Sequence, residues 1–213
     1  MMKPTDTRTP GAITRGRKFD QVRDGASAIF LRDGYAAASV DDIARSARVS
    51  KATLYSYFPD KSLMFREVLR ATLASTFRDA PFQTAPAGQD MQRDLSVMLH
   101  DLAVWSLAEP RLSMLRVITA EATRFPDQAR AYDQAMEDAV VQPLADSIDG
   151  WIAARALQPH DSLRSARQMV ALINGQVQHP ALLNRSAPDE AQIDAIARDA
   201  AAMFVASHGV RAA

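Results

Sequence analysis

Apolar residues recur every three or four positions along most of this 213-residue chain, whereas strict alternation of apolar and polar residues is absent. That spacing places apolar side chains on one face of a helix, and alternation would have indicated strands. The first run ends at Gly34, which suits the left-handed position after a helix, and Ser39 and Asp60 can cap later runs. The pattern predicts short helices at 17–33, 40–47, 51–57 and 61–78.

Longer helices are predicted in the rest of the chain, with prolines between them, at 90–108, 111–124, 127–155, 161–178 and 189–207. Pro143 lies inside the longest run, so we expect that helix to kink or break there. The aperiodic segment 80–89 is rich in Pro, Gly and Gln and marks an expected domain boundary. We therefore predict an all-α protein with a flexible arm at 1–16 and domains at 17–78 and 79–213.

Charge changes sign at the same boundary, although the formal net charge of the chain is +0. Residues 1–78 carry a net +6 and residues 79–213 a net −6, so a basic domain precedes an acidic one. A basic domain favours an anionic partner such as nucleic acid.

The composition also excludes several classes of protein. The absence of cysteine excludes disulfides, thiolate metal clusters and cysteine nucleophiles, and it fits a reducing cytoplasm. No apolar run approaches the roughly 20 residues of a membrane helix, and the first residues lack the apolar core of a signal peptide. We expect a cytoplasmic protein with no membrane partner.

The helices predicted at 40–47 and 51–57 are joined by a three-residue turn, which is the geometry of a helix-turn-helix. In that motif the second helix enters the DNA major groove. Leu54 and Phe58 fall on one side of it, while Ala52, Thr53 and Ser56 on the other side are small enough for close approach to bases. The flanking donors that can reach bases or phosphates are Lys51, Tyr55, Tyr57 and Lys61.

Two segments, SVDDIA at 39–44 and VSKATLYSYFPDK at 49–61, make this region recognisable, and residues 17–78 resemble the DNA-binding domain of the TetR family of repressors. The resemblance implies base contacts by Lys51 and Thr53 and phosphate contacts by Ser39, Tyr55, Tyr57 and Lys61, with Ser50 and Ala52 in the same surface. It also implies a second, all-helical domain that dimerises and binds a small-molecule effector. The expected function is a repressor that an effector releases from a pseudo-palindromic DNA operator.

Two residues depart from the family pattern, namely Gly25 in the first helix and Arg48, where the family usually has Gly. A non-Gly residue in a left-handed turn costs of order 1 kcal/mol, which a phosphate contact by Arg48 would offset. Two alternatives remain open: residues 17–78 form a helical bundle that binds no DNA, and Tyr55 and Tyr57 are ordinary core aromatics.

The second domain contains Met, Trp and other large apolar residues that can line an adaptable pocket for a partly apolar effector. The candidate pocket residues are Met98, Leu102, Trp105, Leu115, Ile118, Phe125, Tyr132 and Met136. Each is also a plain core residue in the alternative interpretation. The rival function is a DNA-binding adaptor whose acidic domain binds a protein partner and no small ligand.

Apolar stripes with small residues run along the last two predicted helices and permit close helix packing. The resemblance implies a four-helix dimer interface there, formed by Leu163, Ala166, Val170, Ile173, Val177, Ile193, Ala197, Ala200 and Phe204. The alternative, which the sequence leaves open, is that these stripes face the core of one subunit.

No motif of an enzyme was found. The four histidines have no metal-binding spacing, and nucleophile-elbow, dinucleotide-binding and phosphate-loop patterns are absent. We therefore expect no catalytic residues, no metal site and no cofactor.

Overall fold

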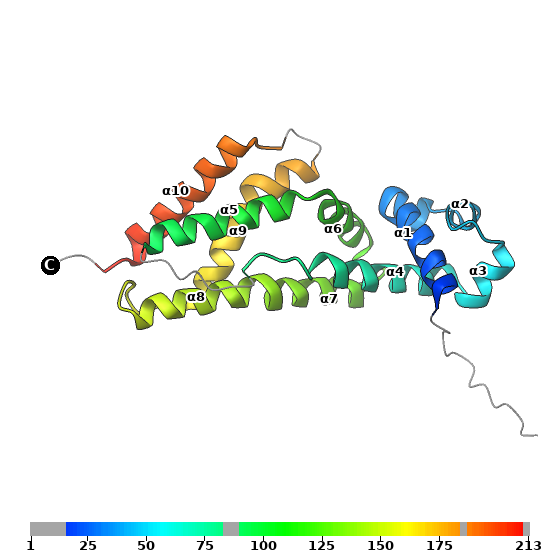
Figure 1. The fold of residues 1–213 in the computed structure, drawn as a ribbon, viewed down its shortest axis with the longest axis horizontal. Coiled ribbons are helices and arrows are strands. Elements are labelled where there is room, and N and C mark those ends of the chain that lie inside the picture. The colour runs from blue at the N-terminus through cyan, green and yellow to red at the C-terminus, as the bar shows by residue number, and fades with distance from the viewer. Residues whose placement is uncertain (1–15, 83–89, 184–186, 211–213) are drawn as a thin grey trace, which may run out of the picture. The chain divides into compact units, whose positions relative to one another are not determined.

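The structure, a computed structural model, describes residues 16–82, 90–183 and 187–210 (Figure 1). These residues form α-helices and one turn of π-helix, and this described part of the chain contains no β-strand. The predicted all-α fold is confirmed. Nearly all of the expected arm at 1–16 and most of the segment 80–89 lie outside the described residues. None of the described helices is long and apolar enough to cross a membrane.

The chain divides into two compact units, Met1–Ala71 and Thr72–Ala213. The division falls inside α4 (Lys61–Thr76), whereas the sequence predicted a boundary after residue 78. Apolar residues at helical spacing, Phe65, Leu69 and Leu73, continue across the division, so one helix belongs to both units. The change in composition and charge comes only after this helix has ended.

The N-terminal unit consists of α1 (Arg17–Ala37), α2 (Val40–Ser46), α3 (Lys51–Tyr57) and the first turns of α4. The last three helices begin at capping side chains, Ser39, Ser50 and Asp60, which accept backbone N–H groups at 2.8–3.3 Å. Hydrogen bonds from the Ser62 hydroxyl and the Leu63 amide hold the pKa of Asp60 below its usual value. The caps fix where each short helix starts and therefore which residues it exposes.

Two glycines shape α1. A Cβ on Gly25 would lie 2.5 Å from the backbone Cα and N of Ala47, so α1 and the end of α2 meet backbone to backbone. Gln21 Nε2 donates to the Ala47 carbonyl at 2.7 Å and holds the same contact. Gly34 has φ +73° and interrupts the helical geometry where the sequence predicted an end, but helical turns resume, so α1 ends at Ala37.

The C-terminal unit contains the end of α4 followed by α5 (Met91–Leu107), α6 (Glu109–Glu121), α7 (Pro126–Met136), the π-turn η1 (Glu137–Val141), α8 (Gln142–Ala153), α9 (Ser162–Leu182) and α10 (Glu190–His208). Figure 1 shows α5 alongside α10, and α5 also packs against α9. The buried core of this unit comes from α5, η1, α8, α9 and α10. The helices α6 and α7 lie outside that core.

The prolines of this unit act differently from one another. The run predicted at 127–155 is broken by the π-turn directly before Pro143, because proline has no N–H for an α-helical bond and its ring crowds the preceding turn. The predicted disruption is therefore confirmed. The helix predicted at 161–178 continues through Pro180 to Leu182, because proline is tolerated so close to a helix end.

The stripes assigned to a dimer interface face the core of the subunit. Eight of their nine residues are buried within the single chain, and Leu163 is partly buried against the same cluster. Burial within one subunit favours the alternative that these stripes face the subunit core, and the dimer-facing role of these residues stays a prediction. The apolar spacing was interpreted correctly as helix packing, but the packing partners are α5 and α8 of the same subunit.

Candidate functional site

The outer face of α3 is exposed in the described part of the chain. Lys51, Ala52, Tyr55 and Ser56 are exposed, and Tyr55 shows 46% of its surface. On the opposite side, Leu54 and Phe58 are completely buried. The narrow exposed face predicted for this helix is therefore confirmed, and its size allows the helix backbone to come close to base edges.

The first turn of α3 brings together two hydroxyl groups. Ser50 Oγ accepts the Thr53 backbone N–H at 3.1 Å, and the Ser50 and Thr53 hydroxyl oxygens lie 2.9 Å apart in a hydrogen bond. Each hydroxyl keeps at least one further donor or acceptor direction. Thr53 is thus held in one orientation at the edge of the exposed face, which suits a side chain that reads a base.

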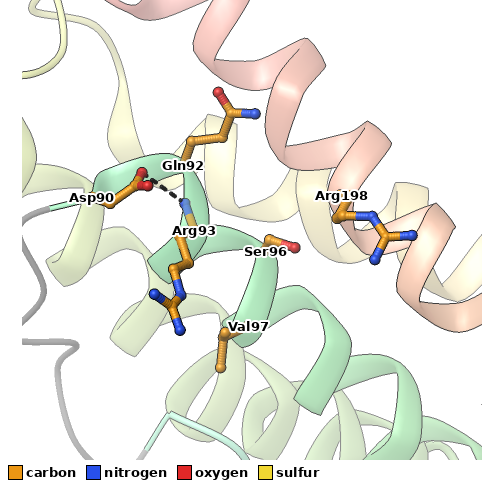
Figure 2. A pocket seen from close by; sticks show the side chains of 6 residues that line it. All are labelled: Asp90, Gln92, Arg93, Ser96, Val97 and Arg198. Carbon is orange, nitrogen blue, oxygen red and sulfur yellow. Dashed lines mark hydrogen bonds between the residues drawn. The ribbon is translucent and has the colours of Figure 1, made fainter.

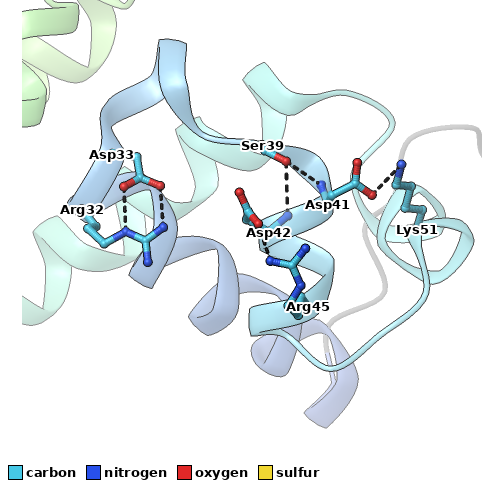
Figure 3. A network of polar contacts seen from close by, with 7 residues as sticks. All are labelled: Arg32, Asp33, Ser39, Asp41, Asp42, Arg45 and Lys51. Carbon is cyan, nitrogen blue, oxygen red and sulfur yellow. Dashed lines mark hydrogen bonds and ion pairs between the residues drawn. The ribbon is translucent and has the colours of Figure 1, made fainter.

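Lys51 is engaged in an ion pair. Its Nζ lies 2.6 Å from Asp41 Oδ1, so the first residue of α3 is tied to the first turn of α2 (Figure 3). The hydrogen bond and charge of Asp41 raise the pKa of Lys51. Figure 3 also shows Arg45 beside Asp42 on α2. The Arg45 Nη1 and Asp42 Oδ1 atoms lie 2.5 Å apart. Lys51 and Arg45 are therefore positioned by carboxylates of α2. A phosphate of bound nucleic acid would compete with these carboxylates for the two cationic side chains.

Arg48 occupies the turn between α2 and α3 with φ +51°, as expected for the position where the resembled family has Gly. The turn is held by backbone hydrogen bonds from Arg48 and Val49 back to Arg45 and Ala44. The Arg48 side chain is exposed. A long cation in this strained turn is consistent with a phosphate contact.

The two tyrosines of α3 have different surroundings. Tyr55 is exposed, whereas Tyr57 is half-buried, with its ring edge-on to Phe19 at 6.3 Å. Lys61 Nζ donates to the Ala36 carbonyl at 3.3 Å and lies 4.7 Å from the centre of the Tyr35 ring. Tyr57 and Lys61 thus contribute to packing as well as to the polar surface, while the core-aromatic alternative does not fit Tyr55.

Two basic residues near the exposed face of α3 were not predicted from the sequence. Arg17 and Lys18 are exposed at the start of α1. The next residue, Phe19, packs against Tyr57 and Phe58, so these bases lie beside the end of α3. The run of basic residues before Phe19 indicated a cationic site. The sequence spacing could not show that this part of α1 lies beside α3.

The C-terminal unit has a cleft of about 490 Å³ lined by residues of α6, α7, η1 and α9. Its apolar lining includes Leu115, Val141 and Val170, and Asn174 and Gln178 line it from α9. Arg111, on α6, also lines it and is only 1% exposed. Burial lowers the pKa of Arg111 to about 10, so the guanidinium remains charged at neutral pH.

The family of bacterial regulatory proteins of the tetR type matches residues 22–68, which contain the helix-turn-helix. The C-terminal domain of AefR-like transcriptional repressors matches residues 95–210, which is more than half of the chain. The chain belongs to the TetR family. It is therefore a DNA-binding transcriptional regulator, and regulators of this family bind DNA operators, usually as dimers that respond to small molecules.

Individual relatives agree with this assignment. The flavonoid-responsive regulator FrrA is 32% identical in sequence and superposes with a TM-score of 0.69. The match covers 93% of this chain and 100% of the FrrA chain. A TetR-family transcriptional regulator of Mesorhizobium loti has the same fold, with a TM-score of 0.79, 24% identity and coverage of 91% and 98%. The DNA-binding transcriptional repressor TetR of Mycobacteroides abscessus is 31% identical over 120 residues, so the match spans 55% of each chain.

The predicted effector pocket of this TetR-family regulator coincides only in part with the cleft. Leu115, Tyr132 and Met136 line it. Met98 and Leu102 are instead part of the main core and do not line this cleft, because their side of α5 faces α9 and α10. Trp105 stacks on Arg111, while Ile118 and Phe125 are buried without lining the cleft.

Arg111 was missed by the sequence reasoning, although a signal existed. It shares a helical face with Met114, Leu115 and Ile118, at spacings of three, four and seven residues. An arginine on an otherwise apolar face indicates a buried charge. Arg116, on the same helix, instead pairs with Glu109 at 3.1 Å.

A second hollow, of about 400 Å³, lies between the start of α5 and α10 (Figure 2). Asp90 caps α5 by accepting the Arg93 backbone N–H at 3.1 Å, and Arg198 faces the hollow from α10. Arg93 and Arg198 are exposed, and Arg198 lies 3.8 Å from Asp194. With no buried polar group among its lining residues, this hollow is a weaker candidate for a ligand site than the cleft at Arg111.

Proposed function

We propose that this regulator is a homodimeric repressor that inserts α3 into the major groove of a pseudo-palindromic operator and is released by a small-molecule effector. The observation that carries the proposal is the exposed, narrow face of α3 above the buried Leu54 and Phe58. In this assignment Lys51, Thr53 and Ala52 contact bases. The phosphate contacts come from Ser39, Arg48, Ser50, Tyr55, Tyr57 and Lys61.

The dimer would present two copies of α3 to half-sites about 34–36 Å apart. Because the apolar stripes of α9 and α10 are buried in the subunit, the contact between subunits would use the outer faces of these helices. Exposed small or apolar residues there, Gly175, Ala202 and Met203, support that arrangement. This role replaces the one first expected for the buried stripes.

The effector would act through α4, which runs unbroken from the N-terminal unit into the C-terminal unit. A shift of this helix changes the separation of the two copies of α3, and a few ångströms of mismatch weakens simultaneous docking. Coupling of this kind is typically about 1–3 kcal/mol. The cleft in the C-terminal unit and the small-molecule response of FrrA support an effector for this chain as well.

Selection of bound duplexes from a random pool tests the proposal. We expect enriched sequences with twofold-related half-sites, and a pool without any enriched sequence would contradict operator recognition. With the selected duplex, Lys61→Ala should weaken binding to all sequences and reduce the salt dependence by about one phosphate contact. Thr53→Ala should mainly change base preference, and Val97→Ala, an exposed change in the C-terminal unit, is the control that should bind like the wild type.

A further inference from the structure

The guanidinium of Arg111 is enclosed by aromatic rings inside the C-terminal unit. Its central carbon lies 3.6 Å from the centre of the Trp105 ring, 5.4 Å from that of Phe77 and 5.7 Å from that of Tyr132. Rings hold a cation by their negative faces, but they accept no conventional hydrogen bonds from its N–H groups. The cage therefore keeps the charge in place without satisfying its donors.

The donors of Arg111 are almost entirely unused. Nη2 donates to Met136 Sδ at 3.0 Å, which is a weak acceptor, and Nε and Nη1 are buried without any hydrogen-bond partner. No carboxylate among the described residues forms a salt bridge with this guanidinium. A buried cation of this kind is costly unless an anion accompanies it, so its surroundings indicate a missing anionic partner.

A second buried group in the same cleft points to the same ligand chemistry. Gln178 is 7% exposed, and its Nε2 is buried without an acceptor. One turn earlier on α9, Asn174 Oδ1 accepts the Ser106 hydroxyl at 2.8 Å, which fixes that amide by its oxygen. The cleft thus collects unused N–H donors, and a ligand that fills it must supply acceptors.

The other charges of the cleft leave Arg111 as its unbalanced cation. Arg167 is paired with Glu137, with Nη2 and Oε1 2.5 Å apart. Asp133 lines the cleft as well but is exposed to solvent. Screening by water weakens the repulsion between Asp133 and a bound anion, whereas the buried Arg111 acts at full strength on a ligand beside it.

We propose that the effector is an organic acid, a single carboxylate on a compact apolar body, whose carboxylate binds the Arg111 guanidinium in this cleft. The carboxylate replaces Met136 Sδ as the acceptor of Nη2 and accepts a second hydrogen bond from the neighbouring Nε or Nη1. Gln178 Nε2 donates to a further acceptor of the ligand. Leu115, Val141 and Val170 contact the apolar body. The volume of about 490 Å³ fits a small-molecule ligand, for which pockets of about 300–1,000 Å³ are usual. This inference rests on the proposed function only in calling the ligand an effector.

The test compares acids with neutral molecules of the same shape. Octanoate and 3-phenylpropionate are titrated against their primary amides, with the full-length protein in the Trp151→Phe background, so that fluorescence reports Trp105 beside Arg111. We expect saturable binding of at least one acid, with an affinity at least about tenfold higher than that of its amide. No binding of either acid, or equal binding of acid and amide, would overturn the proposal.

Two arginines on the same helix provide the matched variants. Arg111→Met keeps an unbranched apolar stem and removes the guanidinium, and Arg116→Met does the same at the arginine paired with Glu109. Arg111→Met should lose the preference for the acid over the amide, while Arg116→Met should keep it. A folded Arg111→Met protein that still prefers the acid would contradict the proposal, and its melting temperature shows whether it is folded.

DNA binding, measured in parallel, separates the two proposals. If the ligand-free protein binds a selected duplex but no acid binds at Arg111, the organic-acid inference fails and the DNA-binding assignment stands. If an acid binds with the expected dependence on Arg111 but no duplex is selected, the operator proposal fails and the ligand site stands. Release of the duplex by the bound acid supports both.

Discussion

The polar groups proposed to bind partners are exposed in the N-terminal unit of this regulator and buried in its C-terminal unit. In the N-terminal unit, the polar and small residues of α3 are exposed, and the residues that hold the helix are buried on its other side. In the C-terminal unit, Arg111 and Gln178 are themselves buried, among the residues that pack the subunit. Recognition is thus separable from stability in the first unit and coupled to it in the second.

The difference follows from the partners that the two surfaces are proposed to bind. DNA is large and polyanionic, so a helix that binds it must be exposed and can rely on many weak, solvated contacts. A small ligand offers little surface, so its site must bury it and supply a few desolvated polar groups. Substitutions that affect one property and not the other can test whether the two units really differ in this way.

The largest effect should come from the two sides of α3. Phe58, whose ring centre lies 5.2 Å from that of Phe19, is completely buried, so Phe58→Ala should reduce the free energy of unfolding by about 3–5 kcal/mol. Tyr55→Ala, on the exposed side, should change it by less than about 0.5 kcal/mol and still weaken DNA binding. Urea unfolding combined with hydrogen exchange of the α1–α3 amides measures the unfolding free energy of each variant. A Tyr55→Ala protein as unstable as Phe58→Ala would contradict the proposed difference between the two sides of α3.

The next effect concerns the backbone contact that positions the helix-turn-helix. In Gly25→Ala the new Cβ would meet the Ala47 backbone at 2.5 Å, so α1 and α2 must move apart, at a cost of about 1–3 kcal/mol. Gly150→Ala is the matched control, because a Cβ there meets nothing within 4 Å and alanine favours the helix by about 0.5–1 kcal/mol. Thermal unfolding should therefore shift in opposite directions in the two variants, and a neutral Gly25→Ala would show that this contact does not constrain the turn.

Sequence reasoning predicted the N-terminal unit well because its determinants are local. Ser39 and Asp60 cap the helices that they precede, Arg48 adopts the left-handed turn, and Leu54 and Phe58 share one side of a seven-residue helix. The caps and the buried side follow from spacings of a few residues, and the turn at Arg48 follows from the resemblance to the family. The need for Gly25 could not be predicted in this way, because it depends on how closely α1 approaches Ala47 in three dimensions.

The C-terminal unit was predicted less well, because helical periodicity gives a buried face without saying what buries it. The stripes of α9 and α10 were genuine, yet a core and a dimer interface require the same residue types, and α5 proved to be the partner. The same ambiguity placed Met98 and Leu102 in the pocket rather than in the core. Arg111 was not predicted because the pocket candidates were chosen for their large apolar side chains, and this criterion omits a cationic residue on an apolar helix face.

A smaller effect should appear in the pH dependence of stability, and it should be confined to the C-terminal unit, since residues 1–71 contain no histidine. Burial, together with the His160 ring stacked at 4.1 Å, lowers the pKa of His208 from 6.5. A depressed pKa in the folded state means that the unfolded state binds the proton more readily. The contribution to stability is therefore complete above about pH 6.5 and is lost as the pH falls through the lower, folded-state value.

Replacing His208 by Gln should flatten the fall in melting temperature between pH 7 and pH 5. The control is His179→Gln, an exposed histidine of α9, which should leave that fall unchanged. Hydrogen exchange should assign the pH-sensitive opening to α8–α10 and not to α1–α3. Equal sensitivity in the N-terminal helices would show that the two units unfold as one and would weaken the comparison.

The smallest effect on stability is expected at the Lys51–Asp41 pair, because both side chains are exposed and surface ion pairs contribute little. Asp41→Asn should leave the melting temperature nearly unchanged. It should strengthen DNA binding, since it frees Lys51 from a competing carboxylate and removes a negative charge close to the expected phosphates. Fluorescence anisotropy with the selected duplex measures this gain, and Asp24→Asn, an exposed acid on α1, is the control for the change in net charge. Weaker binding by Asp41→Asn would instead mean that the pair orients Lys51 for its contact, and that even this exposed face depends on an internal bond for its function.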